Sequence, residues 1–266
     1  MATILNASNS GAGGLVQSAD ASGVLVLQGG GNTQVTINST SMSVRSLNLK
    51  VNVQKFTSSG TYTPTANIVY AIIECVGGGG QGGMAYSYDT TSYGGAGGGG
   101  GGYARKYVTA SDIGSSQTVT IGAGGTGTQG WASPGTSGSN TSVGTLCKAG
   151  GGGGGPAATE GYGGGPGVGI TGDVLITGTP GTPPAYGTYQ TATLGGTGGS
   201  SVLGGGGRGY ASSTSGGHGS GYNGEGYGGG GSGGFSYNLG GVYNGAVWMG
   251  AAGANGAVVI TEFYLG

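Results

Sequence analysis

The sequence predicts a mainly β protein in which glycine tracts form polyglycine II helices and no significant α-helix occurs. Three observations lead to this prediction: 75 of the 266 residues are glycine, β-like segments bracket the glycine runs, and residues 149–256 show no helical periodicity. Six consecutive glycines occupy residues 97–102 and another six occupy residues 150–155. Because glycine brings no side chain to a core and loses much freedom on ordering, backbone hydrogen bonds must hold such tracts.

Disorder and collagen are the competing interpretations of this composition. A chain with 75 glycines and 7 prolines would ordinarily be classed as low-complexity. However, only 6% of the residues are charged and 16 are tyrosine, whereas disordered chains are usually rich in charge and poor in aromatic residues. Collagen requires glycine at every third position, and here glycines are consecutive. Glycine helices that pack side by side are the remaining ordered arrangement.

Residues 1–54 form the first predicted domain, a strand-rich connector that serves attachment and oligomerisation. Short alternating runs at 23–28, 33–37 and 46–53 predict strands. In the last run, Leu and Val at the odd positions share one face and polar residues share the other, which is the period of a half-buried strand. A segment of this size buries little apolar surface on its own, so we expect it to pair with copies of itself or with a larger fibre.

Residues 55–266 form the second predicted domain, which begins with framework strands. Segment 55–63 is a strand broken by a turn, and segment 68–76 is a nearly continuous apolar and β-branched core strand. Further strands are predicted at 103–109, 118–121, 141–148 and 257–264. These segments suffice for a small β-sandwich or barrel, and a sandwich base is the arrangement we expect. Residues 149–256 are then an excursion that leaves this base and re-enters it.

Glycine tracts and Tyr-, Ser- and Thr-rich segments alternate in this domain. The first unit has glycine tracts at 77–83 and 94–102 on either side of the segment 84–93, as an outward and a return path would. At about 3.1 Å per residue, the second tract would span roughly 28 Å. The intervening segment is therefore expected to be a loop at a tip, distant from the β base.

Five motifs in unchanged order carry a resemblance to a known family. They are Phe56–Pro64, Ile72–Gly80, Gly102–Lys106, Val119–Gly125 and Gly253–Glu262. Together they resemble the glycine-rich C-terminal domain of bacteriophage tail fibres, over residues 55–266. The alternation of tracts and loops is also similar to the tip adhesins of T-even-type long tail fibres, whose packed polyglycine helices present receptor-binding loops. Those adhesins are separate polypeptides, whereas here a strand-rich connector precedes the glycine domain.

The resemblance implies a receptor-binding adhesin of a phage tail fibre or tail tip, made in the host cytoplasm and located in the virion. Its implied partners are a bacterial surface receptor, either an outer-membrane protein or a surface polysaccharide, and other phage tail proteins. The expected assembly is a homotrimer. The alternatives are a purely structural fibre subunit and an ice-binding or matrix glycine-rich protein, although the latter requires regular Thr or Ser faces.

The candidate receptor contacts are aromatic, with one acid and one histidine. Tyr and Trp supply rigid contact area, while Ser, Gly and Asn supply adaptable hydrogen bonds. The candidates are Tyr86, Tyr88, Asp89, Tyr93, Trp131, Tyr186, Tyr189, Tyr210, His218, Tyr222 and Tyr227. The alternative for each is that its ring covers the glycine helices, and Trp248 near the last strand favours that role. Tyr86, Tyr88 and Tyr93 favour recognition because their loop is short and anchored at both ends.

Residues suited to catalysis or metal binding are sparse, so we expect no enzymatic activity, cofactor or metal. His218 is the only histidine, and it lies in a glycine-rich segment that is ill suited to holding a base. Glu74 and Glu262 lie on predicted strands, where solvent-facing positions are favoured over a catalytic pair. Cys75 and Cys147 are interpreted as neighbouring structural thiols, with a disulfide as the alternative.

Net charge and hydropathy also restrict the partners. The formal net charge is −1 and the seven Lys and Arg residues are scattered, which argues against nucleic acid or an anionic membrane as a partner. The sequence also lacks the pattern of a signal peptide and any apolar run long enough to span a membrane.

Overall fold

The computed structural model describes residues 25–29, 32–37, 42–44, 49–88, 91–127, 130, 133–156, 161–187, 193–210, 217–237 and 246–266. The chain divides into two compact units, Met1–Leu49 and Lys50–Gly266. The first unit contains an antiparallel sheet in the order β1-β2-β3, formed by β1 (Leu25–Gly29), β2 (Asn32–Ile37) and β3 (Met42–Val44). The strands predicted at 23–28 and 33–37 correspond to β1 and β2.

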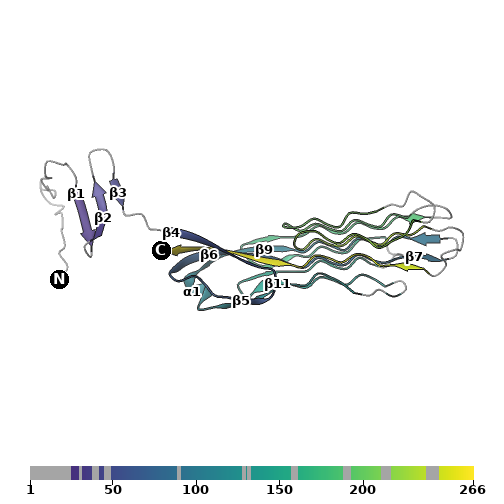
Figure 1. The fold of residues 1–266 in the computed structure, drawn as a ribbon, viewed down its shortest axis with the longest axis horizontal. Coiled ribbons are helices and arrows are strands. Elements are labelled where there is room, and N and C mark those ends of the chain that lie inside the picture. The colour runs from purple at the N-terminus through teal and green to yellow at the C-terminus, as the bar shows by residue number, and fades with distance from the viewer. Residues whose placement is uncertain are drawn as a thin grey trace. The chain divides into compact units, whose positions relative to one another are not determined.

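The second unit begins as a sandwich of two five-stranded sheets (Figure 1). One sheet has the order β14-β9-β6-β17-β4 and the other has the order β13-β12-β11-β10-β5. The strands are β4 (Leu49–Phe56), β5 (Gly60–Tyr62), β6 (Ile68–Val76), β9 (Tyr103–Thr109), β10 (Gln117–Thr120), β11 (Thr141–Val143), β12 (Cys147–Ala149), β13 (Gly169–Thr171), β14 (Val174–Ile176) and β17 (Ala257–Leu265). Within the described residues the only helix is α1 (Ala110–Ile113), so the predicted mainly β fold is confirmed.

The core of the sandwich is a cluster of small and β-branched side chains between the two sheets. It includes Ile73 on β6, Val108 on β9 and Ile260 on β17, all at most 1% exposed. The predicted strands 68–76 and 103–109 match β6 and β9. The strand predicted at 141–148 is instead the hairpin β11–β12, because Gly144 adopts a positive φ of 47° that turns the chain.

The alternation of β4 was predicted correctly, but the prediction of its buried face was wrong. Val51 and Val53 are 56% and 57% exposed, while Asn52 and Gln54 are less exposed and lie on the inner face. The reason is a buried acid on the neighbouring strand β17, which needs the hydrogen-bond donors that Asn52 and Gln54 supply. This pairing also places most of β4 in the larger unit, so the division falls at residues 49–50 rather than at 54–55.

Glu262 is that acid, and its expected solvent-facing position was wrong. Its side chain is fully buried and accepts hydrogen bonds from five donors. They are Asn52 Nδ2 at 2.7 Å, Gln54 Nε2 at 3.2 Å, Tyr62 Oη at 2.8 Å, Thr65 N at 2.9 Å and Thr65 Oγ1 at 2.6 Å. Burial alone would raise the pKa of this carboxyl, but the hydrogen bonds outweigh it and hold the pKa below its usual value. Glu74 lies on the opposite face of the sheet, so the two acids do not form a pair.

The two cysteines lie in the same sandwich core as free thiols. Cys75 Sγ donates to the carbonyl of Cys147 at 3.7 Å, and Cys147 Sγ donates to the carbonyl of Ala104 at 3.4 Å. The hydrogen bond with Cys147 and burial both raise the pKa of the Cys75 thiol. The predicted neighbouring structural thiols are present, and they are not joined by a disulfide.

The glycine tract 94–102 shows the hydrogen-bond repeat of a threefold helix. Successive N–H groups donate to three different segments, and the same order returns three residues later. The bonds run from Gly97, Gly98 and Gly99 to Thr182, Gly231 and Gly153, and from Gly100, Gly101 and Gly102 to Thr179, Gly228 and Gly150, at 2.8–3.0 Å. Three residues per turn without bonds inside the helix is the geometry of polyglycine II. Both tracts predicted to be ordered, 94–102 and 149–155, are therefore held by bonds to neighbouring segments.

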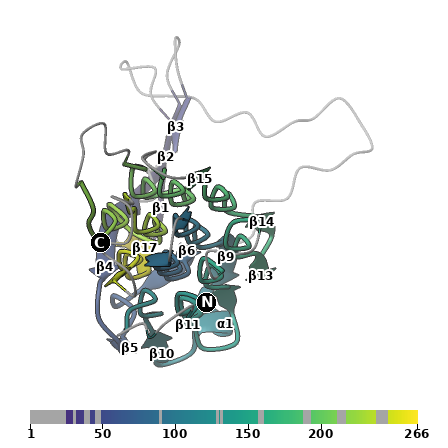
Figure 2. The ribbon, with the colours of Figure 1, turned by 90° about the vertical axis from the view of Figure 1, so that its right-hand side faces the viewer.

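The tract 94–102 is surrounded on all sides. Its carbonyls accept hydrogen bonds from a further three segments, 77–83, 164–167 and 196–199. All nine of its residues are buried, and none has a positive φ. Figure 2 shows the tracts end-on as triangular coils packed side by side. Since each backbone touches the next, the absence of side chains is what permits this packing.

The tracts alternate in direction between the base and a far end (Figure 1). The tract 77–83 pairs antiparallel with 94–102 and parallel with 150–155, as outward and return paths require. At the far end lies a small antiparallel sheet in the order β15-β8-β7-β16. Its strands are β7 (Ala85–Tyr88), β8 (Thr91–Tyr93), β15 (Tyr186–Gly187) and β16 (Val247–Trp248). We call this end of the unit the tip.

Candidate functional site

The tip is built on the ends of the central tracts. The chain passes from the tract 77–83 directly into β7 and returns through β8 into the tract 94–102. Tyr186 of β15 pairs with Tyr93, and Trp248 of β16 pairs with Ala85. Strands from three regions far apart in the sequence therefore meet in one sheet, which fixes the positions of several predicted contact residues.

The three tyrosines of the 84–93 segment differ in exposure. Tyr88 is 59% exposed, Tyr93 is partly buried and Tyr86 is only 6% exposed. The rings of Tyr86 and Tyr93 stack, with centroids 4.6 Å apart. The burial of Tyr86 indicates that its ring supports the tip, whereas most of Tyr88 lies at the surface.

A second aromatic group lies on a neighbouring part of the tip. Tyr210 and Tyr222 are 43% and 37% exposed, with ring centroids 6.0 Å apart. The buried ring of Phe235 lies 4.6 Å from Tyr210, and the guanidinium of Arg208 lies 4.4 Å from the Tyr222 centroid. An aromatic pair that is backed by a buried ring and flanked by a cation combines stacking area with a hydrogen-bond donor.

His218 and Trp248 form a further pair, with ring centroids 4.5 Å apart. Pro183, Pro184 and Leu194 line a shallow pocket of about 320 Å³ next to Tyr210. Thr182 and Thr197 also line it, and their hydroxyl oxygens are 3.1 Å apart. These features extend the surface of the tip that a ligand could contact.

Two residues of this region were missed by the sequence analysis. Tyr162 is 60% exposed, and Arg208 covers the Tyr222 ring. Tyr162 could have been found by the same reasoning that singled out the 84–93 segment, because it lies between the tracts 150–155 and 163–167. The contact made by Arg208 depends on tertiary packing and has no sequence signal.

The remaining candidates lie elsewhere or outside the described residues. Tyr227 lies at the base end, where Lys55 of β4 approaches its ring centroid at 5.9 Å, so it is not part of the tip. Asp89, Trp131 and Tyr189 fall outside the described residues, as does the side chain of Tyr186. Their predicted roles stay predictions.

The described part of the chain offers no group of three or more His, Cys, Asp or Glu residues placed to hold a metal ion. In that same part, none of the helical structure is long and apolar enough to cross a membrane.

Comparison with protein families identifies the class to which this fold belongs. A family model described as a glycine-rich domain matches residues 55–262. The matched segment runs from the end of β4 into β17 and includes the whole tract body. The chain therefore belongs to the glycine-rich domain family. A comparison with curated proteins finds no match.

Proposed function

We propose that this chain is a receptor-binding adhesin of a bacteriophage tail fibre or tail tip. The observation that carries the proposal is the gathering of exposed aromatic residues at the end of the glycine body opposite the β sandwich. Tyr88, Tyr162, Tyr210 and Tyr222 are each at least 37% exposed there. A rigid body that holds such residues away from its point of attachment suits the recognition of a surface.

The composition of the tip supports recognition rather than catalysis. Rigid aromatic rings beside Ser, Thr and Gly supply contact area and adaptable hydrogen bonds at small entropic cost. In the proposed role the partner is a bacterial outer-membrane protein or a surface polysaccharide, and the sandwich end faces other tail proteins. A purely structural fibre subunit would have no need to collect exposed tyrosines at one end. Among the candidates described only Tyr227 lies at the base, and among the described exposed tyrosines only Tyr107 does.

The test is adsorption of the purified, fluorescently labelled chain to a panel of bacteria. Each strain is presented intact, after protease treatment, and after removal of surface glycans. Saturable binding to a subset of strains, lost after one of the two treatments, is the expected result and identifies the receptor class. Uniformly absent or non-saturable binding across a panel that includes the natural host would overturn the proposal.

A further inference from the structure

The sheet β14-β9-β6-β17-β4 has an outer face that is apolar and exposed. Its inner face supplies the sandwich core, through residues such as Ile73 and Ile260. On the outer face, five apolar side chains from three strands are between 41% and 57% exposed. They are Val51 and Val53 on β4, Tyr107 on β9, and Val174 and Ile176 on β14. We call these five residues and the surface between them the outer face.

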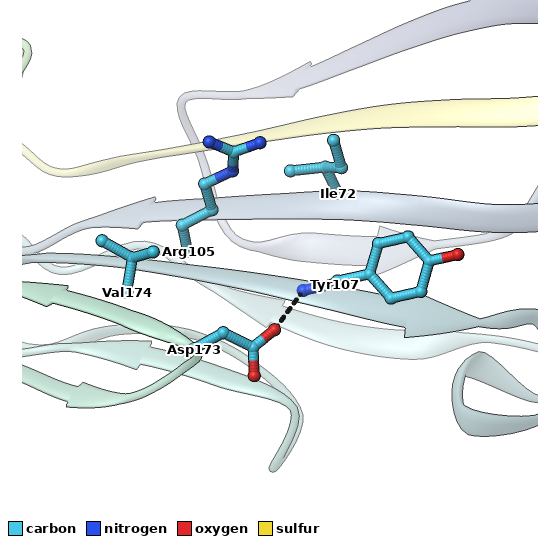
Figure 3. Close-up of a pocket in the computed structure, with 5 residues that line it drawn as sticks. All are labelled: Ile72, Arg105, Tyr107, Asp173 and Val174. Carbon is cyan, nitrogen blue, oxygen red and sulfur yellow. Dashed lines mark hydrogen bonds between the residues drawn. The ribbon is translucent and has the colours of Figure 1, made fainter.

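Aromatic rings make this face continuous across the middle of the sheet. Tyr107 of β9 stacks on Tyr70 of β6 with centroids 5.1 Å apart, and Tyr70 stacks on Phe263 of β17 with centroids 4.4 Å apart. A shallow pocket of about 210 Å³ lies at the β9 side of this face, and Ile72, Arg105 and Tyr107 are among the residues that line it (Figure 3). Contiguous apolar surface of this kind is uncommon on monomers and marks interaction sites.

The size of the face matches a protein interface. Five strands spaced about 4.8 Å apart and up to about 30 Å long give a flat area of roughly 600 Å². A stable interface buries about 800 Å² on each partner, and the relief of the side chains brings the accessible area of the face to that order. The edge strand β4 adds unpaired backbone groups at one border, which favour association with another chain.

The charges of the face suit an identical copy. Glu74 and Arg105 lie opposite each other in register on β6 and β9, and Glu74 accepts a hydrogen bond from Tyr103 at 2.6 Å. At the β14 border, Asp173 is paired with Lys106 at 2.8 Å. These acids and bases balance locally, and the remaining charge on this side of β4, Lys55, lies over the Tyr227 ring. A second copy would therefore meet little repulsion, and a strongly charged partner would meet little attraction.

We propose that the outer face is the surface through which a second copy of this chain associates. The sequence-based expectation assigned oligomerisation to residues 1–54, which include Val51 and Val53, whereas the other three residues of the outer face lie outside that segment. The proposed association is independent of receptor binding, because the tip aromatics lie at the other end of the unit. A monomeric variant can therefore still adsorb to cells, which separates failure of this proposal from failure of the proposed function.

The test measures the oligomeric state of the full chain by light scattering and sedimentation across a wide range of concentration. The wild-type chain is expected to be oligomeric, and the double variant Val51→Lys with Val53→Lys is expected to be monomeric. The matched control is Thr118→Lys with Thr120→Lys, which places the same charges at the same spacing on exposed positions of β10. The control is expected to keep the wild-type assembly.

A second variant, Tyr107→Lys, alters the same face from the other side of the sheet and is also expected to dissociate the assembly. If the β4 variant fails to fold, the oligomeric state of Tyr107→Lys still tests the proposal. A monomeric wild-type chain would overturn the proposal. So would an oligomer that survives the folded face variants, or a control that dissociates as readily as they do.

Discussion

A Cβ atom at Gly99 would lie 2.0 Å from the carbonyl oxygen of Gly165, whereas a Cβ atom at Gly165 would have no heavy atom within 4 Å. The two glycines belong to adjacent tracts and face each other asymmetrically. The demand for glycine in this body therefore differs from residue to residue, and this difference can be measured.

We predict that Gly99→Ala is severely destabilising and that Gly165→Ala is neutral. The first change forces two hydrogen-bonded backbones apart. The loss of stability should equal or exceed the roughly 1–3 kcal/mol that extra methylene groups usually cost in a well-packed core. The second places a methyl group in open space, and its effect should stay within about 0.5 kcal/mol. Thermal melting of both variants beside wild type checks this, and equal melting temperatures for the two would refute the tract packing.

A second prediction separates two tyrosines only two residues apart. Tyr88→Ala should leave the melting temperature unchanged and reduce adsorption to host cells by on the order of tenfold, because its exposed ring would be a contact anchor. Tyr86→Ala should lower the melting temperature, because it removes a buried ring that stacks on Tyr93. Adsorption assays and melting curves on both variants would show the reverse pattern if Tyr86 were the contact.

The buried carboxylate of Glu262 gives a prediction for stability. Glu262→Gln should cost roughly 1–3 kcal/mol at neutral pH, since the amide cannot accept all the bonds that the carboxylate accepts. Urea unfolding of both chains provides the measurement. Glu262→Ala, which leaves Tyr62 Oη and Thr65 N without this acceptor, should cost more than Glu262→Gln.

The same residue gives a prediction for pH. The folded pKa of Glu262 lies below the unfolded value of about 4.3, so its stabilising contribution is complete above that value and is lost as the pH falls through the folded pKa. The stability difference between wild type and Glu262→Gln should therefore be constant near neutrality and shrink in acid. A difference that stayed unchanged down to strongly acidic pH would rule out ionised Glu262 as the source.

The thiols give a prediction for reactivity. Burial and hydrogen bonding raise the pKa of Cys75, so native protein should react with a disulfide reagent only on the timescale of unfolding. In denaturant, both cysteines should react at once and release two equivalents of the reagent's thiol per chain. Prompt labelling of either cysteine in the native chain would show that the sandwich core opens without global unfolding.

Much of the base could be predicted because its strands carry local signals. The apolar run Ile68–Val76 and the segment Tyr103–Thr109 were located from β-branched and aromatic residues alone. The face of β4 could not be predicted, because its polar residues turn inward to a carboxylate 210 residues away from Asn52. Alternation defines two faces of a strand, but only the tertiary partner decides which one is buried.

At the tip, the sequence located the aromatic residues but not their exposure. Tyr86 and Tyr88 lie two residues apart on β7 and therefore point to the same side of the strand. They differ in exposure because Tyr86 lies opposite Tyr93 and stacks on its ring, whereas Tyr88 lies at the end of the strand, opposite Thr91. Likewise, the tracts were predicted as packed helices, but which tract lies at the centre depends on bonds between distant segments. Tandem glycines contain no information about which neighbour each will meet.

The central position of the tracts 77–83 and 94–102 has a consequence for biosynthesis. Apart from the bonds that the two tracts make to each other, their hydrogen-bond partners lie between residue 125 and residue 254. When the ribosome has made these two tracts, most of the groups that will satisfy them do not yet exist, and β17, the central neighbour of β6, comes last. The middle of this body can therefore form only after the chain has been made as far as residue 254, and termination before that point would leave some of its innermost amides and carbonyls facing water.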